Sequence, residues 1–230
     1  MSAVFAAGIH LVKLAITIVC LPRITIRLDA KHGVQFFDLF TRPHRRFLFI
    51  GQKTIAVAVL HLPASPTLYL AGKHRQAVRT NRTRCLTHGY QVRAFDPLAH
   101  RSEVESIHLS LPDRQGKKMD YCRHEDLQQA RDFSADYLGV FAPSGELVAC
   151  ACTPICGQAA LQLTFIGHPD HWINGVMYAL QVAVVETAIR HGAQWLTYEG
   201  FFGQSDGMRY YLARCGYIPV NVTWRIAQDS

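Results

Sequence analysis

DGMRYYLARCGY, residues 206–217, predicts a short helix over residues 207–215 that is followed by Gly216 and a final strand over residues 217–226. A strand over residues 195–199 precedes it. Before that strand, a longer helix is expected to begin at Asn174, a residue type that commonly caps helices, and to close at Gly192. That helix carries an apolar stripe at helical spacing, formed by Met177, Leu180, Val184 and Ala188.

Three strands are expected upstream of this helix, at residues 137–142, 147–155 and 159–167. Short turns separate them, the first at Pro143-Ser144-Gly145-Glu146. The segment 168–174 between the third strand and the helix is polar and irregular. Residues 137–226 therefore predict three antiparallel strands, a helix, a strand, a helix and a strand.

The first third of the chain is also rich in strands. Alternating apolar and polar residues predict a strand at 23–29, and two apolar runs at 46–50 and 54–62 predict a hairpin. A basic helix follows at 72–88, with Gly89 in the position of a C-terminal cap. The remaining expectations are a strand at 90–95, an irregular stretch at 96–122 and a short helix at 125–133.

Composition limits the class of protein. The chain has 230 residues, of which 49% are hydrophobic, enough to bury a sizeable core. Its net charge of +7 favours anionic partners: nucleic acid, phosphorylated cofactors or an acidic membrane surface. Seven cysteines, an odd number without a disulfide framework, indicate reduced thiols and a cytoplasmic protein.

The apolar residues 3–22 raise the question of a targeting or membrane segment. His10 and Lys13 lie near the middle of this run, where a charge costs several kcal/mol in a bilayer. A buried element of the fold is therefore preferred to a signal or an anchor, and no stable membrane insertion is expected. The same apolar segment could cover an oligomer surface.

The element order and the sequence at 206–217 resemble the GNAT acyltransferases, in which the last helix is followed by glycine and an aromatic residue. The segment Tyr198-Glu199-Gly200-Phe201-Phe202-Gly203 and the spacing of Gly207 and Gly216 resemble the Fem-type aminoacyltransferases of the same superfamily. The basic helix followed by a strand is a further Fem-type feature. The resemblance covers mostly the residues after Tyr137.

The resemblance implies an α+β fold with a central mixed, mostly antiparallel GNAT-like sheet, flanked by helices and preceded by a strand-rich extension. We expect residues 1–95 to form the N-terminal region, a possible partial GNAT-like half, and residues 96–230 the acyltransferase domain. The implied reaction transfers an acyl group from an acyl-CoA-type thioester to an amine acceptor. An aminoacyl-tRNA donor and a binding module without catalysis are the alternatives.

Two departures from the family patterns concern the donor. The acetyl-CoA signature [QR]-x-x-G-x-[GA] is absent, and only Gly175 keeps a glycine near the start of the long helix. In the last helix, Leu212 occupies the position at which GNAT enzymes often place a tyrosine acid and Fem-type enzymes a lysine. Tyr211 stands beside it.

The resemblance implies that the strands at 161–167 and 195–199 splay apart, and that the thioester arm lies in the gap with its phosphates at the helix start. The catalytic candidates are Glu199 and Asp170 as bases and Tyr211 as proton donor. The candidate donor-binding residues, which include an H-x-x-H pair, are Phe165, Ile166, Gly167, His168, His171, Asn174, Gly175 and Val176.

The basic helix is the candidate surface for tRNA, because its cations could follow a line of phosphates. The residues proposed for this role are Lys73, Arg75, Arg79 and Arg82. Cys150, Cys152 and Cys156 do not have the spacing of a closed zinc site, so no metal is expected. Anionic lipid is an alternative partner for the basic surface.

Overall fold

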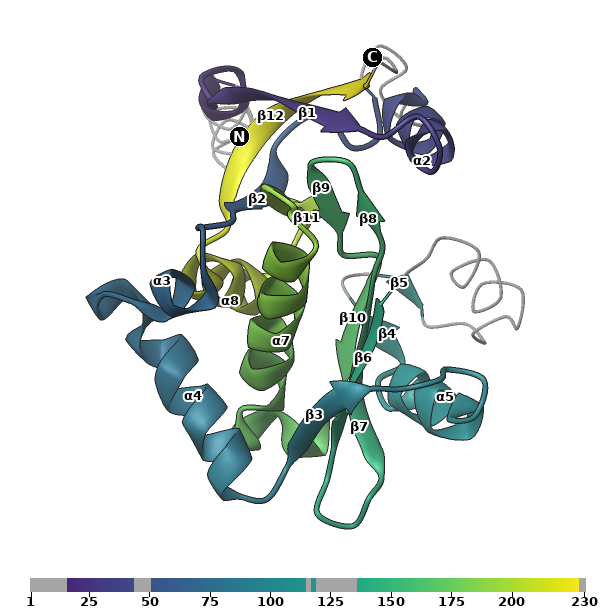
Figure 1. The fold of residues 1–230 in the computed structure, drawn as a ribbon, viewed down its shortest axis with the longest axis vertical. Coiled ribbons are helices and arrows are strands. Elements are labelled where there is room, and N and C mark those ends of the chain that lie inside the picture. Colours follow the sequence, from purple (N-terminus) through teal and green to yellow (C-terminus); the bar gives the residue numbers. More distant parts are fainter. Residues whose placement is uncertain (1–15, 44–50, 115–116, 119–135, 228–230) are drawn as a thin grey trace, which may run out of the picture.

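The computed structural model describes residues 16–43, 51–114, 117–118 and 136–227 (Figure 1). The strands are β1 (Arg23–Leu28), β2 (Val57–His61), β3 (Gln91–Ala94), β4 (Asp113–Arg114), β5 (Lys117–Lys118), β6 (Asp136–Phe141), β7 (Leu147–Thr153), β8 (Ile155–Cys156), β9 (Ala159–Leu161), β10 (Thr164–Gly167), β11 (Trp195–Gly200) and β12 (Ile218–Ile226). The helices are α2 (Gly33–Thr41), α3 (Pro66–Leu70), α4 (Gln76–Thr87), α5 (Arg101–Leu109), α7 (Val176–Arg190) and α8 (Asp206–Cys215), with 3-10 turns η1 (Lys73–Arg75) and η2 (Pro169–Asn174).

Two sheets carry the fold, besides the short β4–β5 pair. One has six strands in the order β1-β12-β2-β11-β9-β8, and the other has four in the order β10-β7-β6-β3. β2 lies antiparallel between β11 and β12, while β1 runs parallel to β12. Strands from the first 95 residues are therefore hydrogen-bonded to strands from the last 40. The division at residue 95 stays a prediction.

The expected strand at 159–167 changes sheets halfway along. β9 pairs in parallel with β11, and β10 pairs antiparallel with β7. At the junction the Gln162 amide donates to the Thr197 carbonyl at 3.0 Å, and the next amide, that of Leu163, donates to Cys152 at 3.1 Å. Beyond this point β10 and β11 belong to different sheets and are no longer paired, and the separation of their backbones is here called the gap.

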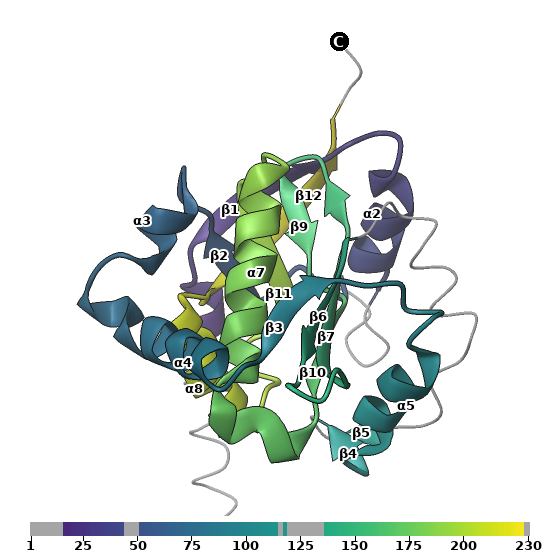
Figure 2. The ribbon, with the colours of Figure 1, turned by 60° about the horizontal axis from the view of Figure 1, so that its bottom comes forward.

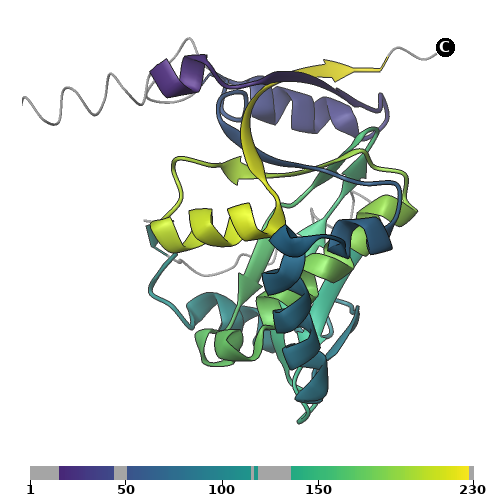
Figure 3. The same cartoon turned by 90° about the vertical axis from the view of Figure 1, so that its left-hand side faces the viewer.

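Helices cover both faces of the four-stranded sheet (Figure 2). α7 packs on β6 and β7 with α4 alongside, and α5 packs on β7 and β10 through different residues. α2 covers the inner face of β1 and β12, where Phe36 and Phe40 meet Ile26 and Trp224. Figure 3 shows β1 and β12 above α2, with their other face directed outward.

Several local expectations are corrected. Residues 101–109 within the expected irregular stretch form α5, because Val104 and Ile107 are buried against the sheet. The basic helix begins as the 3-10 turn η1, and Gly89 has the expected positive φ of 80°. Asn174 does not cap α7, because Gly175 in the left-handed region is the N-cap. The predictions for 46–50 and 125–133 lie outside the described residues.

Candidate active site

β10 is an edge strand of its sheet, so the edge that faces the gap has no strand partner. Hydrogen-bonded pairs recur every second residue in an antiparallel ladder, and His168 donates to Val148 of β7 at 2.8 Å. The same alternation directs the Ile166 amide toward β7 and the Phe165 amide toward the gap. Of the two donor-binding candidates Phe165 and Ile166, only Phe165 has its amide on the side of the gap, where it can donate to a carbonyl oxygen.

Tyr211 lies beside this edge. Its ring centroid is 6.0 Å from that of Phe165 and 4.9 Å from that of Tyr178 in α7, and its hydroxyl donates to the Met177 carbonyl at 2.9 Å. Burial, and next the nearby Cys215 thiol, raise the pKa of Tyr211 well above its ordinary value. The phenol is therefore neutral at physiological pH and suited to donating a hydrogen bond or proton. Leu212, in contrast, is 2% exposed and belongs to the core.

A closed ring of hydrogen bonds lies where the two sheets separate. Tyr217 donates to Gln162 Oε1 at 2.8 Å, Gln181 Nε2 donates to the Tyr217 hydroxyl at 3.0 Å, and Gln162 Nε2 donates to Gln181 Oε1 at 3.4 Å. All three side chains are buried. The sequence prediction missed this ring, although two glutamines within apolar runs were a possible signal.

The H-x-x-H pair joins a second polar chain at the end of β10. The Tyr90 hydroxyl is 2.8 Å from His171 Nδ1 and accepts a hydrogen bond from Asn174 Nδ2 at 2.9 Å. The rings of His168 and His171 are 5.9 Å apart, and His168 Nδ1 is 3.7 Å from an Asp170 carboxylate oxygen. Tyr90 therefore brings His171 and Asn174 together, a role that the sequence did not reveal.

The start of α7 is covered by α4. Gly175 has φ of 79°, and a Cβ atom there would be 2.2 Å from the backbone oxygen of Asn81 in α4. Gly175 and Val176 are both buried. The Trp172 indole donates to the carbonyl of Gly167 at 3.1 Å and closes the turn from β10. This packing counts against Gly175 and Val176 as ligands of a pyrophosphate.

The two carboxylate candidates lie in different surroundings from Tyr211. Glu199 forms an ion pair of 3.2 Å with Lys53, whose ammonium also stands 5.0 Å from the Phe40 ring centroid. Asp170 has a side chain that is 80% exposed. A paired carboxylate and a solvated one are weaker candidates for a general base than the sequence alone indicated.

Most arginines of the basic segment are engaged within the protein. Arg75 donates to the Arg214 carbonyl, Arg79 to the carbonyls of Leu70 and Gly72, and Arg84 to the Ile173 carbonyl. Arg82 pairs with Glu186 of α7 at 3.6 Å. These contacts tie η1 and α4 to α7 and α8. Lys73 is exposed and has no such contact among the described residues.

Neither a metal cluster nor a membrane helix is found in the parts of the chain that the structure describes. No group of three or more His, Cys, Asp or Glu side chains is arranged to hold a metal ion there. Within the same ranges, no helix is long and apolar enough to cross a membrane. Cys150, Cys152 and Cys156 are buried.

Comparison with solved structures identifies the fold. No protein-family model and no curated protein matches the chain. The chain is similar to FemX, with a TM-score of 0.58 and 10% identity over 84% of this chain and 68% of that one. It is also similar to L-PGS from Bacillus licheniformis, with a TM-score of 0.52 and 15% identity over 71% of this chain and 57% of that one.

A third similar structure is the C-terminal domain of a putative lysylphosphatidylglycerol synthetase from Agrobacterium fabrum, with a TM-score of 0.50 and 14% identity over 71% of this chain and 57% of that one. The chain thus spans 57% of the length of this structure and of L-PGS. The predicted GNAT-like α+β fold is confirmed, and FemX is among the structures that resemble it.

Proposed function

We propose that this protein is an acyl-group transferase that takes an aminoacyl group from charged tRNA and passes it to an amine acceptor. The donor carbonyl lies in the gap between β10 and β11, facing the Phe165 amide. Tyr211 donates to the leaving ribose oxygen, which needs a proton when the ester bond breaks. The support for this reaction is the local geometry together with the GNAT-like fold.

The observation that favours tRNA over acyl-CoA is the packing of α4 on the start of α7. A CoA pyrophosphate would need backbone amides at a helix N-terminus. Gly175 and Val176 are buried, Gly175 packs against the Asn81 backbone, and its amide already donates to the Trp172 carbonyl at 3.0 Å. An aminoacyl ester makes no such demand, because its phosphates lie outside the gap. The likeness to FemX is consistent with this choice of donor.

Acyl-CoA remains the second candidate donor, because the gap itself is the feature that the resemblance assigns to a thioester arm. The His168–His171 pair next to it could then meet phosphate oxygens from the side of β10. In both cases His171, held by Tyr90, is the candidate that receives the proton of the attacking amine. Glu199 is the alternative base only if its pair with Lys53 opens.

The experiment follows the release of radiolabelled amino acids from a pool of charged tRNA. Primary amines test the proposed acceptor class, and vesicles containing phosphatidylglycerol, the lipid in the name of the similar Agrobacterium fabrum synthetase, offer a hydroxyl acceptor as the comparison. We expect product formation above spontaneous hydrolysis with the amines, and transfer to the lipid alone would contradict the proposed amine acceptor. Thermal shift with acetyl-CoA is run in parallel, where a ligand at 100 times its Kd stabilises by about 2.7 kcal/mol. A higher melting temperature with acetyl-CoA, together with no transfer from charged tRNA, would make acyl-CoA the preferred donor.

A further inference from the structure

The outer face of β1 and β12 is a second cationic surface. Alternation along each strand buries Ile26 and Trp224 against α2 and directs their neighbours outward. The two strands pair in parallel register, so residues in one register row lie side by side on the same face. The six residues of this face, here called the ribbon face, are Arg23, Thr25, Arg27, Asn221, Thr223 and Arg225.

The ribbon face has positive charge that nothing within the described residues neutralises. Arg23, Arg27 and Arg225 are exposed, and their guanidinium groups have neither an ion pair nor a hydrogen bond to any described residue. None of the six residues is acidic. In this respect the ribbon face differs from α4, whose arginines are held by Leu70, Gly72, Glu186 and Ile173.

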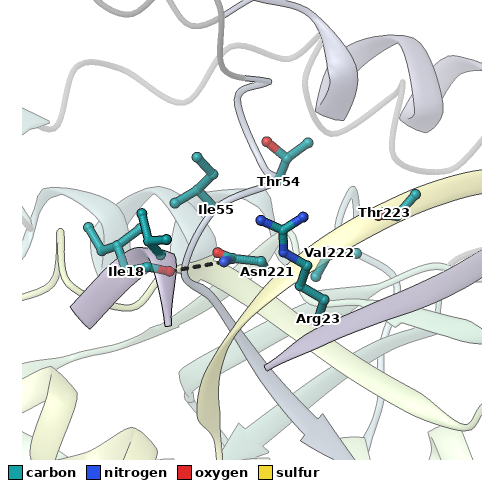
Figure 4. A pocket seen from close by; sticks show the side chains of 8 residues that line it. Ile18, Arg23, Thr54, Ile55, Asn221, Val222 and Thr223 are labelled. Atoms are coloured by element: carbon teal, nitrogen blue, oxygen red, sulfur yellow. Dashed lines mark hydrogen bonds between the residues drawn. The ribbon is translucent and has the colours of Figure 1, made fainter. Parts of the chain in front are cut away.

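Arg23 is also accessible from the side. It borders a cavity of about 260 Å³ that is lined by aliphatic side chains and by Thr54 and Asn221. Figure 4 shows its side chain rising from β1 with the guanidinium toward Ile55 and Thr54. Among the described residues that line this cavity, Arg23 is the one with a charge. The Asn221 amide there already donates to the Ile18 carbonyl at 3.0 Å.

The spacing of the cations suits a chain of phosphates better than a single anion. Four residues along a strand separate Arg23 from Arg27 by about 13 Å, whereas Arg27 and Arg225 are neighbours at about 4.8 Å. The hydroxyls of Thr25 and Thr223 lie between them and can donate to phosphate oxygens, as such side chains commonly do in nucleic-acid complexes.

We propose that the ribbon face binds the phosphate backbone of the RNA that delivers the acyl group. This inference rests on the proposed tRNA donor and assigns its docking surface to β1 and β12 instead of α4. Val220 of β12 is level with Gly200 at the end of β11. At the usual strand spacing and rise per residue, Arg23 in β1 is therefore about 15 Å and Arg225 in β12 about 20 Å from that end of β11. A single-stranded 3′ end of a few nucleotides spans that distance to the gap.

RNA is favoured over an anionic membrane because the ribbon face has no aliphatic side chain to insert among acyl chains. Exposed aliphatic residues do occur nearby, since Ile16 and Val19 are 59% and 68% exposed. They belong to the helical turn before β1. The experiment therefore includes a membrane arm.

The test measures binding of uncharged bulk tRNA by fluorescence anisotropy at several salt concentrations, using the full chain. The variant R23Q/R27Q/R225Q is compared with wild type and with the control R42Q/R93Q/R190Q, which removes three exposed charges elsewhere. We expect the ribbon variant to weaken binding at least tenfold and to reduce the salt slope by about one per arginine. The control variant retains most of the wild-type affinity. Circular dichroism verifies that both variants fold.

Each other outcome overturns the inference in a distinguishable way. Equal loss in the two variants would mean that net charge alone attracts RNA. If the ribbon variant binds tRNA as tightly as wild type does, the RNA binds at another surface. The proposed transfer reaction would not be affected by that result. Absence of tRNA binding by wild type would remove the proposed donor as well. Loss of binding to phosphatidylglycerol vesicles but not to tRNA would assign the ribbon face to a membrane.

Discussion

The hydroxyl of Tyr211 in α8 donates to the backbone carbonyl of Met177 in the first turn of α7, across 2.9 Å. This bond joins the two helices that flank the gap and holds the phenol beside Phe165. The hydroxyl needs only to exchange this acceptor for a substrate oxygen to serve as a proton donor.

Replacing Tyr211 with Phe is expected to lower the rate of acyl transfer by about 10²–10⁴, the usual contribution of a positioned acid. The free energy of unfolding should fall by only about 1 kcal/mol, because one hydrogen bond is lost. The control is Tyr210→Phe, since Tyr210 is 60% exposed. Equal transfer rates in both variants would exclude Tyr211 as the donor.

The contact between Gly175 and Asn81 can be isolated from backbone strain. Gly175 and Gly192 have nearly the same φ, 79° and 76°, but a Cβ at Gly192 would meet nothing within 4 Å. Both alanine variants incur the left-handed penalty of about 1–2 kcal/mol. Gly175→Ala should lose about 1–3 kcal/mol more through overpacking. Urea unfolding measures the difference, and equal losses would mean that α4 yields readily.

The arginines of α4 are expected to stabilise the fold rather than bind a ligand. Arg79→Gln removes the side-chain donor to the Leu70 carbonyl and one of two donors to the Gly72 carbonyl, which keeps the Arg75 amide, and should cost about 1.5–3 kcal/mol. Lys73→Gln, at an exposed neighbouring cation, should change stability by less than about 0.5 kcal/mol. Thermal unfolding of both variants tests this, and an unaffected Arg79→Gln protein would make α4 a free cationic surface again.

The buried ring should be sensitive to the loss of any one member. Tyr217→Phe leaves Gln162 Oε1 and Gln181 Nε2 without partners, at a cost of about 1–3 kcal/mol. Adding Gln162→Leu and Gln181→Leu should recover part of that loss, because no polar group is then left unsatisfied. Chemical denaturation of the single and triple variants measures it. Strictly additive losses would show that the ring is not a unit.

Stability should fall at alkaline pH. Burial raises the pKa of Cys156 and of Cys215 from 9.0 to about 12 and that of Cys152 to about 11. As the pH rises, the thiols of the unfolded chain lose their protons before those of the folded protein. The free energy of unfolding is therefore unaffected by these thiols below about pH 9 and decreases as the pH rises from about 9 to the pKa of each thiol in the folded protein. Above pH 9, each thiol contributes a decline of about 1.4 kcal/mol per pH unit.

Urea midpoints between pH 7.5 and 10.5 measure this decline. Cys156→Ala should flatten the profile, whereas Cys20→Ser should leave it unchanged because Cys20 is exposed. A flat wild-type profile up to pH 10.5 would contradict the assignment. The buried phenol of Tyr217, whose pKa burial also raises, adds to the decline only above its ordinary value of 10.0.

Local sequence predicted most elements that have local causes. The helix ending before Gly216 and the strand at β1 follow from glycine placement and from strict alternation. α5 was missed because its apolar positions, Val104 and Ile107, are few and lie within a polar stretch. The local sequence also gives no signal for the break between β9 and β10. What separates the two strands is that the Gln162 amide donates to β11 and the Leu163 amide donates to β7, which belong to different sheets.

The candidate site was predicted only in part, because some of its residues are marked by local sequence and others are brought together by contacts between distant segments. Tyr211 was selected because it stands beside the position that the family patterns mark, and the fold places it next to Phe165. The pairing of Glu199 with Lys53 and the cover of Asn81 over Gly175 join residues far apart in the chain. No spacing rule anticipates such contacts, and they are what changed the preferred donor from acyl-CoA to tRNA.

The insertion of β2 between β11 and β12 has a consequence for how the chain acquires its structure. β2 cannot be hydrogen-bonded on both sides until the segment around Val59 meets Thr197 and Ile218, far along the chain. Long-range pairings of this kind slow folding and leave strand edges open in the meantime. During synthesis, the apolar run from Val57 to Leu60 stays unpaired until β11 and β12 have been made. This segment is therefore most prone to aggregation before those two strands leave the ribosome.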